Sequence, residues 1–91
     1  MNPAPPASWY YVYVLKSIKT NHYYFGCTSD LENRITEHKD GRVFTTKKML
    51  PVELIYYEAY SEKAPAFKRE KMLKQYGSAC SDLKRRIGGA G

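Results

Sequence analysis

The sequence lacks a long apolar run, because no stretch approaches the roughly 20 consecutive apolar residues that a helix needs to span a bilayer. Its first residues, Met1 to Ser8, lack the basic start and long apolar segment of a secretory signal peptide. Cysteine is scarce, with two residues in 91, and neither belongs to a cluster with metal-ligand spacing. We therefore expect no membrane association, free thiols and a cytoplasmic location.

Acidic residues are also few: 9 Asp plus Glu stand against 15 Lys plus Arg, for a net charge of +6. A small basic domain is typical of a protein with a polyanionic partner, most often nucleic acid. A protein from a basic proteome is the alternative, and charge alone does not separate the two. The length indicates one domain at residues 9–87, between a disordered lead-in at 1–8 and a flexible tail at 88–91.

Three segments have the aromatic and β-branched composition of strands: Trp9–Lys16, His22–Cys27 and Val52–Tyr60. Both alternating faces of the first are apolar, which predicts a central strand buried on two sides. The polar segment between the first two predicts an antiparallel hairpin. Gly26, near the end of the second, indicates a close approach of another chain segment or a sharp exit.

Capping signals place the helices. Ser29-x-x-Glu32 is a capping-box pattern that starts a first helix, and Gly41 fits its end. Residues 41–51 then form a basic loop. Ser61 is the expected N-cap of a second helix that runs to about Tyr76 and ends at Gly77. A short third helix is expected at 81–87. The predicted fold class is α+β, a small three-stranded antiparallel sheet flanked by two to three helices.

Tyr13 and Tyr24 lie on the two strands of the predicted hairpin, and strand pairing brings them close. A tyrosine hydroxyl has a free pKa of about 10, so it acts as a base only when a neighbour takes its proton. His38 on the first helix is such a neighbour, and Arg34 four residues earlier has a planar fork for phosphate oxygens. There are two alternatives. The tyrosines could simply pack in the core, and Arg34 and His38 could form the half-solvated border of an amphipathic helix.

Glu70 falls where the spacing of the second helix calls for an apolar residue, on the face shared by Ala66, Phe67 and Leu73. An inward acid is costly unless it is paired or binds a metal. On spacing alone, a surface acid paired with Lys71 or Lys74 is the simpler interpretation. The basic residues that we expect to contact nucleic acid are Arg42, Lys47, Lys48 and Lys74.

The order and spacing of these residues together carry more information about function than any one residue does. From Tyr10 to about Lys74 the sequence resembles the small stand-alone GIY-YIG nucleases, and it is similar to the N-terminal nuclease domain of the excision-repair incision protein. Tyr11-Val12-Tyr13 matches the first motif with Tyr11 in place of glycine, and Tyr24-Phe25-Gly26 matches the second with Phe25 in place of isoleucine.

The resemblance implies a metal-dependent endonuclease that hydrolyses phosphodiester bonds with Mg²⁺ or Mn²⁺, on nucleic acid, most often DNA, in repair or recombination. It implies Tyr13 or Tyr24 as general base or water-positioning residue, Arg34 as transition-state stabiliser and Glu70 as metal ligand. His38 falls where some family restriction enzymes carry a histidine.

Two departures leave other functions open. Cys27 stands where the excision-repair domain has a lysine, and no asparagine follows Asn33, although many family nucleases have one after the glutamate helix. The alternatives are a catalytically weak or inactive nucleic-acid-binding module of the same fold, and a protein-interaction domain recruited to a larger nuclease or repair assembly.

Overall fold

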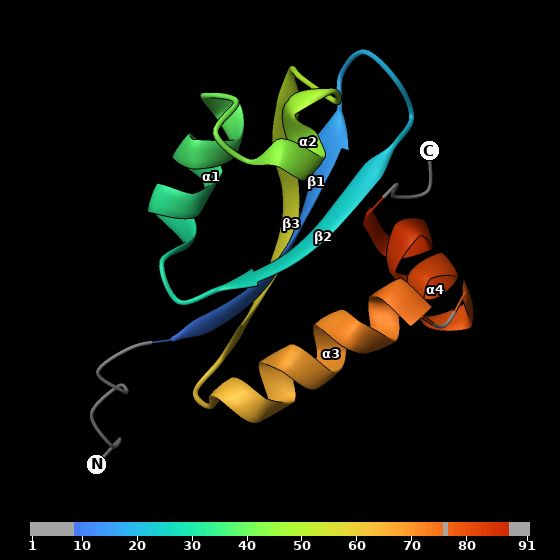
Figure 1. Cartoon of the computed structure of the whole chain (residues 1–91). Helices are drawn as coiled ribbons and strands as arrows, with labels where there is room; N and C mark the ends of the chain where they lie inside the picture. The colour runs from blue at the N-terminus through green and yellow to red at the C-terminus, as the bar shows by residue number, and fades with distance from the viewer. Residues whose placement is uncertain (1–8, 76, 88–91) are drawn as a thin grey trace.

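The fold is described from a computed structural model that covers residues 9–75 and 77–87, without the side chains of 77–80. The expected lead-in at 1–8, the expected tail at 88–91 and the expected helix end at Tyr76 lie outside the described residues. The elements follow in the order β1 (Tyr10–Ser17), β2 (Tyr23–Thr28), α1 (Leu31–Lys39), α2 (Phe44–Lys47), β3 (Val52–Tyr60), α3 (Lys63–Gln75) and α4 (Gly77–Ile87) (Figure 1).

The three strands form one antiparallel sheet in the order β2-β1-β3. The predicted α+β class and the central position of the first strand are therefore confirmed. Tyr13 in the middle of β1 pairs with Gly26 of β2 and Tyr57 of β3. Because side chains alternate along a strand, the ring of Tyr13 lies on the same sheet face as that of Tyr24, whose pairing partner is Leu15.

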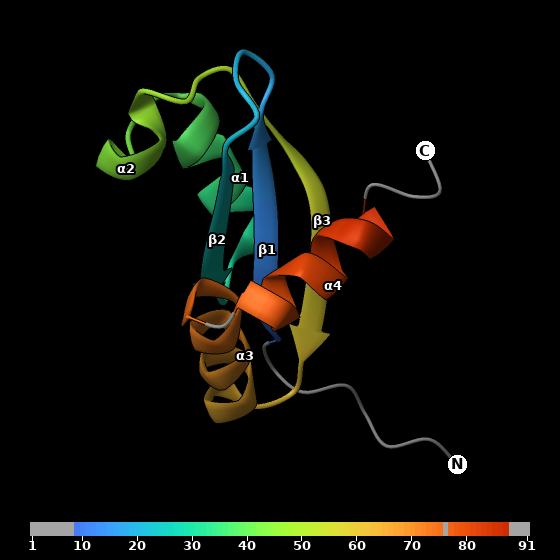
Figure 2. The same ribbon diagram turned by 90° about the vertical axis from the view of Figure 1, so that its right-hand side faces the viewer.

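Helices lie on both faces of the sheet, with α1 and α2 on one and α3 and α4 on the other (Figures 1 and 2). Each layer has its own apolar core, because β1 is buried on both sides. Val12 and Val14 of β1 pack with side chains of α3 and α4. Tyr13 and Leu15 pack on the other side, next to side chains of α1. No helix in the described ranges is long and apolar enough to cross a membrane.

One charged cluster ties β3 to α3. The carboxylate of Glu58 accepts hydrogen bonds from Arg69 at 3.0 Å and from the hydroxyls of Tyr56 and Tyr60 at 2.7 and 2.6 Å. These donors lower the pKa of Glu58 against the opposing effect of its burial, which is the largest single influence. The cluster fixes α3 against the edge of the sheet.

Helix boundaries were predicted less well than strands. Asp30, not Ser29, caps α1: its side chain accepts from the backbone N–H of Asn33 at 3.2 Å. The expected basic loop contains the short helix α2. The helix α3 begins two residues after Ser61, and Gly77 begins α4, which absorbs the expected short helix at 81–87.

Candidate active site

Tyr13 is the centre of the site, and it is almost completely buried, with 1% of its surface exposed. Its ring centroid lies 6.2 Å from that of Tyr24 and 5.6 Å from that of the His38 imidazole. The rings of Tyr24 and His38 are 5.0 Å apart. The expected meeting of the two tyrosines is therefore confirmed, and β1, β2 and α1 contribute one ring each to the cluster.

Gly26 makes room for Tyr13. A Cβ at this position would lie 2.4 Å from both Cζ and the hydroxyl of the Tyr13 ring, which no real contact allows. The ring of Tyr13 thus passes directly over the bare backbone of β2, as the close approach inferred from the sequence requires. A side chain at this position would therefore displace the hydroxyl of Tyr13.

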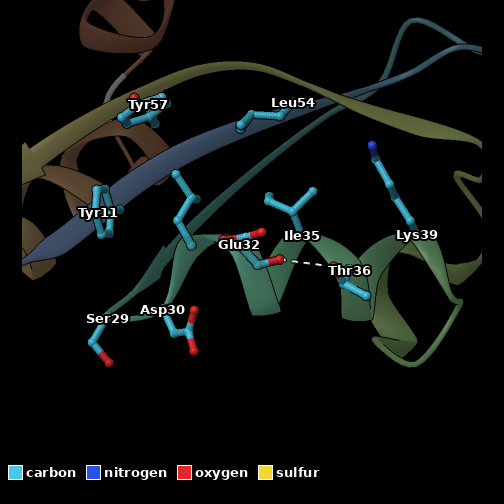
Figure 3. A pocket seen from close by; sticks show the side chains of 10 residues that line it. Tyr11, Ser29, Asp30, Glu32, Ile35, Thr36, Lys39, Leu54 and Tyr57 are labelled. Atoms are coloured by element: carbon cyan, nitrogen blue, oxygen red, sulfur yellow. Dashed lines mark hydrogen bonds between the residues drawn. The ribbon is translucent and has the colours of Figure 1, made fainter.

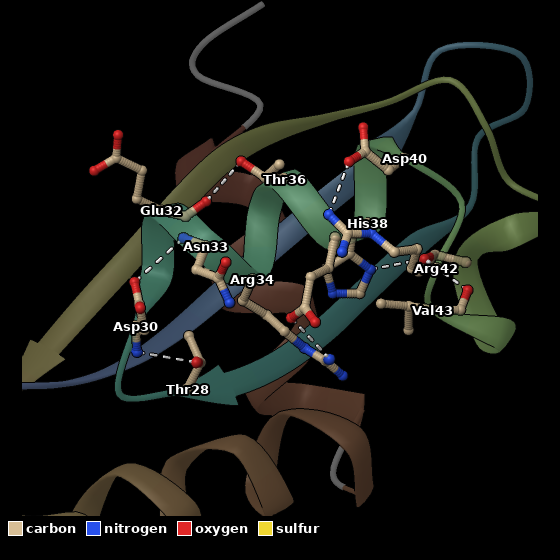
Figure 4. A network of polar contacts seen from close by, with 12 residues as sticks. Thr28, Asp30, Glu32, Asn33, Arg34, Thr36, His38, Asp40, Arg42 and Val43 are labelled. Carbon is tan, nitrogen blue, oxygen red and sulfur yellow. Dashed lines mark hydrogen bonds and ion pairs between the residues drawn. The ribbon is translucent and has the colours of Figure 1, made fainter.

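His38 is buried completely and both of its ring nitrogens have a partner. Nε2 lies 2.8 Å from the hydroxyl of Tyr13, and Nδ1 lies 2.7 Å from Oγ1 of Thr46 in α2. Figure 4 shows the imidazole directed from α1 toward the segment that carries Val43, just before α2. The sequence placed His38 beside the tyrosine correctly, but it contained no sign of Thr46.

Burial shifts the pKa values of Tyr13 and His38 in opposite directions. It raises the pKa of Tyr13 to about 12 and, with help from the positive charge of Arg34, lowers the pKa of His38 to about 4. At neutral pH the tyrosine is therefore a protonated hydroxyl and the histidine is a neutral imidazole. A neutral imidazole has one nitrogen free to accept a proton.

Arg34 joins this pair from α1. Its guanidinium lies close enough to the hydroxyl of Tyr13 for that hydroxyl to raise the pKa of Arg34. One of its nitrogens also lies 3.4 Å from the carboxylate of Glu37, one turn along the helix. Figure 4 shows the long side chain of Arg34 extending away from the axis of α1. Its side chain is about one-third exposed (36%), so a phosphate could reach it.

Glu70 reaches the same region from α3. Burial is the main cause of the raised pKa values of Tyr13 and Cys27, and the negative charge of Glu70 adds to both. The side chain is 19% exposed and forms an ion pair with Lys74 at 3.2 Å. The ammonium of Lys74 lies 5.8 Å from the centroid of the Tyr24 ring. Glu70 is thus partly buried at the site and paired with Lys74, which combines features of both interpretations of the sequence.

Three comparisons with known proteins bear on this arrangement. The family model described as the GIY-YIG catalytic domain matches residues 9–84. The chain belongs to the GIY-YIG family. The match spans every element of the sheet and every residue of the site, so the resemblance on which the sequence analysis rested is confirmed.

Relatives of this GIY-YIG chain include small proteins of similar length. It is 40% identical to the UPF0213 protein SH2523 of Staphylococcus haemolyticus over 74% of this chain and 82% of the relative. It is 40% identical to the UPF0213 protein YazA of Bacillus subtilis over 72% and 67%. The solution NMR structure of the UPF0213 protein BH0048 of Bacillus halodurans superposes with a TM-score of 0.55 at 25% identity, covering 90% of this chain and 87% of that one.

The donor atoms of this GIY-YIG site suit a hard cation with few protein ligands. In the part of the chain that the structure describes, no three His, Cys, Asp or Glu side chains gather as a metal-binding group. Glu70 is a partly buried carboxylate whose charge acts on the hydroxyl of Tyr13, and Mg²⁺ commonly uses one or two carboxylates and fills its shell with phosphate oxygens and water. The residues present therefore fit Mg²⁺ held jointly with a substrate phosphate.

The basic residues expected at the substrate lie in two places. Lys74 is at the site, as described above. Lys47 and Lys48 are exposed at the end of α2, directly after the threonine that contacts His38. Arg42 is exposed as well and pairs with Asp40 at 2.9 Å. These three residues are thus exposed on and next to the short helix that carries Thr46.

Sequence reasoning missed two residues of the site. Thr46 lies in a segment interpreted as a solvated loop, and a lone threonine carries no signal for burial. Glu37 carries no signal of its own in the sequence, because acids on a helix surface are usually solvated. The spacing of Arg34 and Glu37, three residues apart on one helix, is the only local sign of their ion pair.

A cleft of this GIY-YIG chain lies elsewhere, on the other flank of α1 (Figure 3). Its volume is about 630 Å³. Helical geometry separates the two flanks, because Glu32 and Thr36 project away from Arg34 and His38. None of the expected site residues lines the cleft. The residues that do are Tyr11, Ser29, Asp30, Leu31, Glu32, Ile35, Thr36, Lys39, Leu54 and Tyr57.

Proposed function

We propose that this protein is a metal-dependent endonuclease that hydrolyses phosphodiester bonds in DNA. The observation that carries the proposal is the buried contact of 2.8 Å between the hydroxyl of Tyr13 and Nε2 of His38, with the positive charge of Arg34 close to the same hydroxyl. A structural tyrosine needs no neutral imidazole at its hydroxyl, whereas a proton relay does.

The two pKa values define how this relay works. With a pKa of about 12, Tyr13 does not ionise by itself at neutral pH. Proton transfer must therefore be concerted: the hydroxyl accepts a proton from the attacking water while its own proton passes to Nε2 of His38. The incoming phosphate favours this transfer, because its negative charge stabilises the imidazolium that forms. His38, neutral above its pKa of about 4, is ready to accept over the whole physiological range.

Arg34 has two tasks in this scheme. In the free protein it lies at the hydroxyl of Tyr13 and at Glu37. When a phosphate binds, its planar fork can pair with two phosphate oxygens and stabilise the charge that grows on them in the transition state. As Arg34 turns to the phosphate, it leaves the hydroxyl of Tyr13. This movement uncovers the hydroxyl for the attacking water. Substrate binding and exposure of the base are thereby linked.

Glu70 would hold the metal, which would supply Lewis-acid stabilisation of the phosphate and of the leaving oxygen. The ammonium of Lys74 occupies the carboxylate of Glu70 in the free protein. We expect Lys74 to turn from the carboxylate to the DNA backbone when a divalent ion is present, because the ion outcompetes a single ammonium for a hard carboxylate oxygen.

DNA is the proposed substrate because of charge and family. The net charge of +6 and the exposed lysines after α2 favour a polyanion. Membership of the GIY-YIG family, in which the resemblance points to repair and recombination, favours DNA and a place in a larger repair assembly. Mg²⁺ or Mn²⁺ as cofactor and a cytoplasmic location belong to the same proposal.

A second candidate function is a nucleic-acid-binding module without catalysis. The Glu70–Lys74 ion pair favours it, since a carboxylate neutralised by lysine needs no metal. Cys27 in place of the lysine of the excision-repair domain favours it as well. Both functions require nucleic-acid binding, so only cleavage separates them.

The test is the variant Glu70→Gln, assayed with linear, branched and single-stranded DNA in Mg²⁺ and in Mn²⁺. Glutamine is nearly isosteric and uncharged, so the fold and DNA binding should survive while metal-dependent cleavage is lost. Glu62→Gln is the matched control, because Glu62 is exposed just before α3. Equal cleavage by both variants would exclude Glu70 as the metal ligand. Wild-type protein that binds but never cleaves would leave the binding module as the function.

A further inference from the structure

Three buried side chains from three elements form a continuous chain of hydrogen bonds. Tyr13 of β1 is 1% exposed, and both His38 of α1 and Thr46 of α2 are 0% exposed. The contacts are 2.8 Å from the Tyr13 hydroxyl to Nε2 and 2.7 Å from Nδ1 to Oγ1 of Thr46. Such short contacts between groups with no access to water require that each link has one donor and one acceptor.

The direction of the chain follows from Arg34. A guanidinium only donates and its positive charge lies close to the Tyr13 hydroxyl, so the oxygen of this hydroxyl, and not its proton, turns toward Arg34. The proton of the Tyr13 hydroxyl is then free to point to His38, which makes Nε2 the acceptor. A neutral imidazole with a bare Nε2 carries its proton on Nδ1.

Thr46 completes the chain. The Nδ1–H group of His38 donates to Oγ1 of Thr46, and the threonine hydroxyl turns its own proton to the backbone carbonyl of Val43, 3.5 Å away. Among the described residues, no buried side-chain nitrogen or oxygen lacks a partner in this arrangement. The opposite direction would have Nε2–H donate to Tyr13 beside the positive charge of Arg34, and the tyrosine proton would then lose His38 as its acceptor.

We propose that Thr46 is a positioning residue that holds His38 in the tautomer with the proton on Nδ1. This leaves Nε2 bare, so that the O–H bond of Tyr13 can break as an Nε2–H bond forms, while a proton of the attacking water replaces the one that Tyr13 gives up. The tautomer assignment concerns the free protein. Only its effect on turnover rests on the proposed nuclease function.

The other histidine of the chain is a reference for the tautomer of His38. The two histidines are His22 and His38. His22 makes a similar contact, with Nδ1 lying 3.0 Å from Oγ1 of Thr20, but this pair is exposed in the hairpin loop. Water competes for every bond of the exposed pair and for none of the buried one. The two imidazoles should therefore differ in tautomer although each has a threonine partner.

The first experiment measures the tautomer directly by long-range proton–nitrogen correlation NMR on full-length protein with ¹⁵N-labelled histidine, near pH 7.5. A protonated and a bare ring nitrogen have well-separated shifts. We expect His38 to show a protonated Nδ1 and a bare Nε2, and His22 to show the mixture of a solvated imidazole. A His38 signal with the proton on Nε2 would overturn the proposal outright.

The second experiment changes Thr46. Thr46→Val keeps the shape and removes the acceptor, so we expect the His38 proton to move from Nδ1 to Nε2. Thr46→Ser keeps the hydroxyl and should retain the wild-type tautomer. Thr45→Val is the matched control, because the neighbouring threonine is exposed on the same short helix. Should Thr46→Val fail to fold, the wild-type and serine spectra still decide the tautomer.

Cleavage provides a separate measurement. Loss of proton transfer typically lowers a rate by ~10²–10⁴, so kcat of Thr46→Val should fall by about 10²-fold at the least, with little change in KM. Thr46→Ser should recover most of the loss. An unchanged tautomer in a folded Thr46→Val variant, or an unchanged kcat in a wild type that cleaves, would overturn the positioning role. Absence of cleavage by the wild type would refute the nuclease function and leave the tautomer result standing.

Discussion

The buried neutral histidine should make the stability of this protein depend on pH well above the range in which carboxylates titrate. The pKa of His38 falls from about 6.5 in an unfolded chain to about 4 in the folded protein. The folded state favours the neutral form, so its contribution is fully present above pH 6.5 and is lost as the pH falls through 4. A difference of about 2.5 in pKa corresponds to about 3 kcal/mol in the free energy of unfolding.

Most of this loss is expected in a window where few other groups titrate. At pH 5 the linkage relation gives a loss of about 2 kcal/mol relative to neutral pH. Glu58, whose pKa is lowered by Arg69 and two tyrosines against the effect of burial, also costs stability in acid, but only below its ordinary pKa of 4.5. The interval between about pH 6.5 and 4.5 therefore reports mainly on His38.

The assay is urea unfolding at a series of pH values from 7.5 to 4.5 for the wild type and His38→Gln. Glutamine does not titrate, so the wild-type stability should fall toward pH 5 while that of the variant stays nearly level. His22→Gln serves as the control and should follow the wild type, because His22 is exposed. Parallel curves for wild type and His38→Gln would refute a buried, unprotonated His38 and the relay built on it.

Three further predictions concern other parts of the molecule. Gly26→Ala places a Cβ 2.4 Å from the hydroxyl of Tyr13; we expect the buried ring to shift, with a loss of about 1–3 kcal/mol in thermal unfolding. Glu58→Gln removes the charge that binds the arginine of α3 and leaves that arginine partly buried, so urea unfolding should show a loss of about 1–3 kcal/mol. Replacing Lys47 and Lys48 by alanine should lower the slope of log affinity for DNA against log salt by about 1–2.

The last two of these predictions have a control on the same chain. Asp82→Asn breaks an exposed ion pair with Arg85 and should change stability little, in contrast to Glu58→Gln. Lys19→Ala with Lys68→Ala removes two exposed charges away from α2 and should leave more of the salt dependence in place. An unshifted Tyr13 signal in Gly26→Ala, or equal slopes for the two lysine pairs, would contradict the geometry of the site or of its basic border.

The sequence by itself determined the sheet and the family, because both depend on local patterns. Aromatic and β-branched residues define each strand, and the double apolar face of residues 9–16 is enough to make that strand central. The hairpin then fixes which residues of the two motifs face each other, so the proximity of Tyr13 and Tyr24 follows from strand pairing alone. Arg34 and His38 followed from the helix that comes next.

Tertiary structure alone decided the chemistry of the site, because protonation depends on burial and on neighbours remote in sequence. No local pattern shows that His38 is sealed from water, nor that Thr46 lies behind it, since the short helix α2 is set by its packing and not by a capping signal. The same holds for Glu70, for which the helical spacing left an inward metal ligand and a surface acid as alternatives. Its position near Tyr13 results from how α3 packs on the sheet.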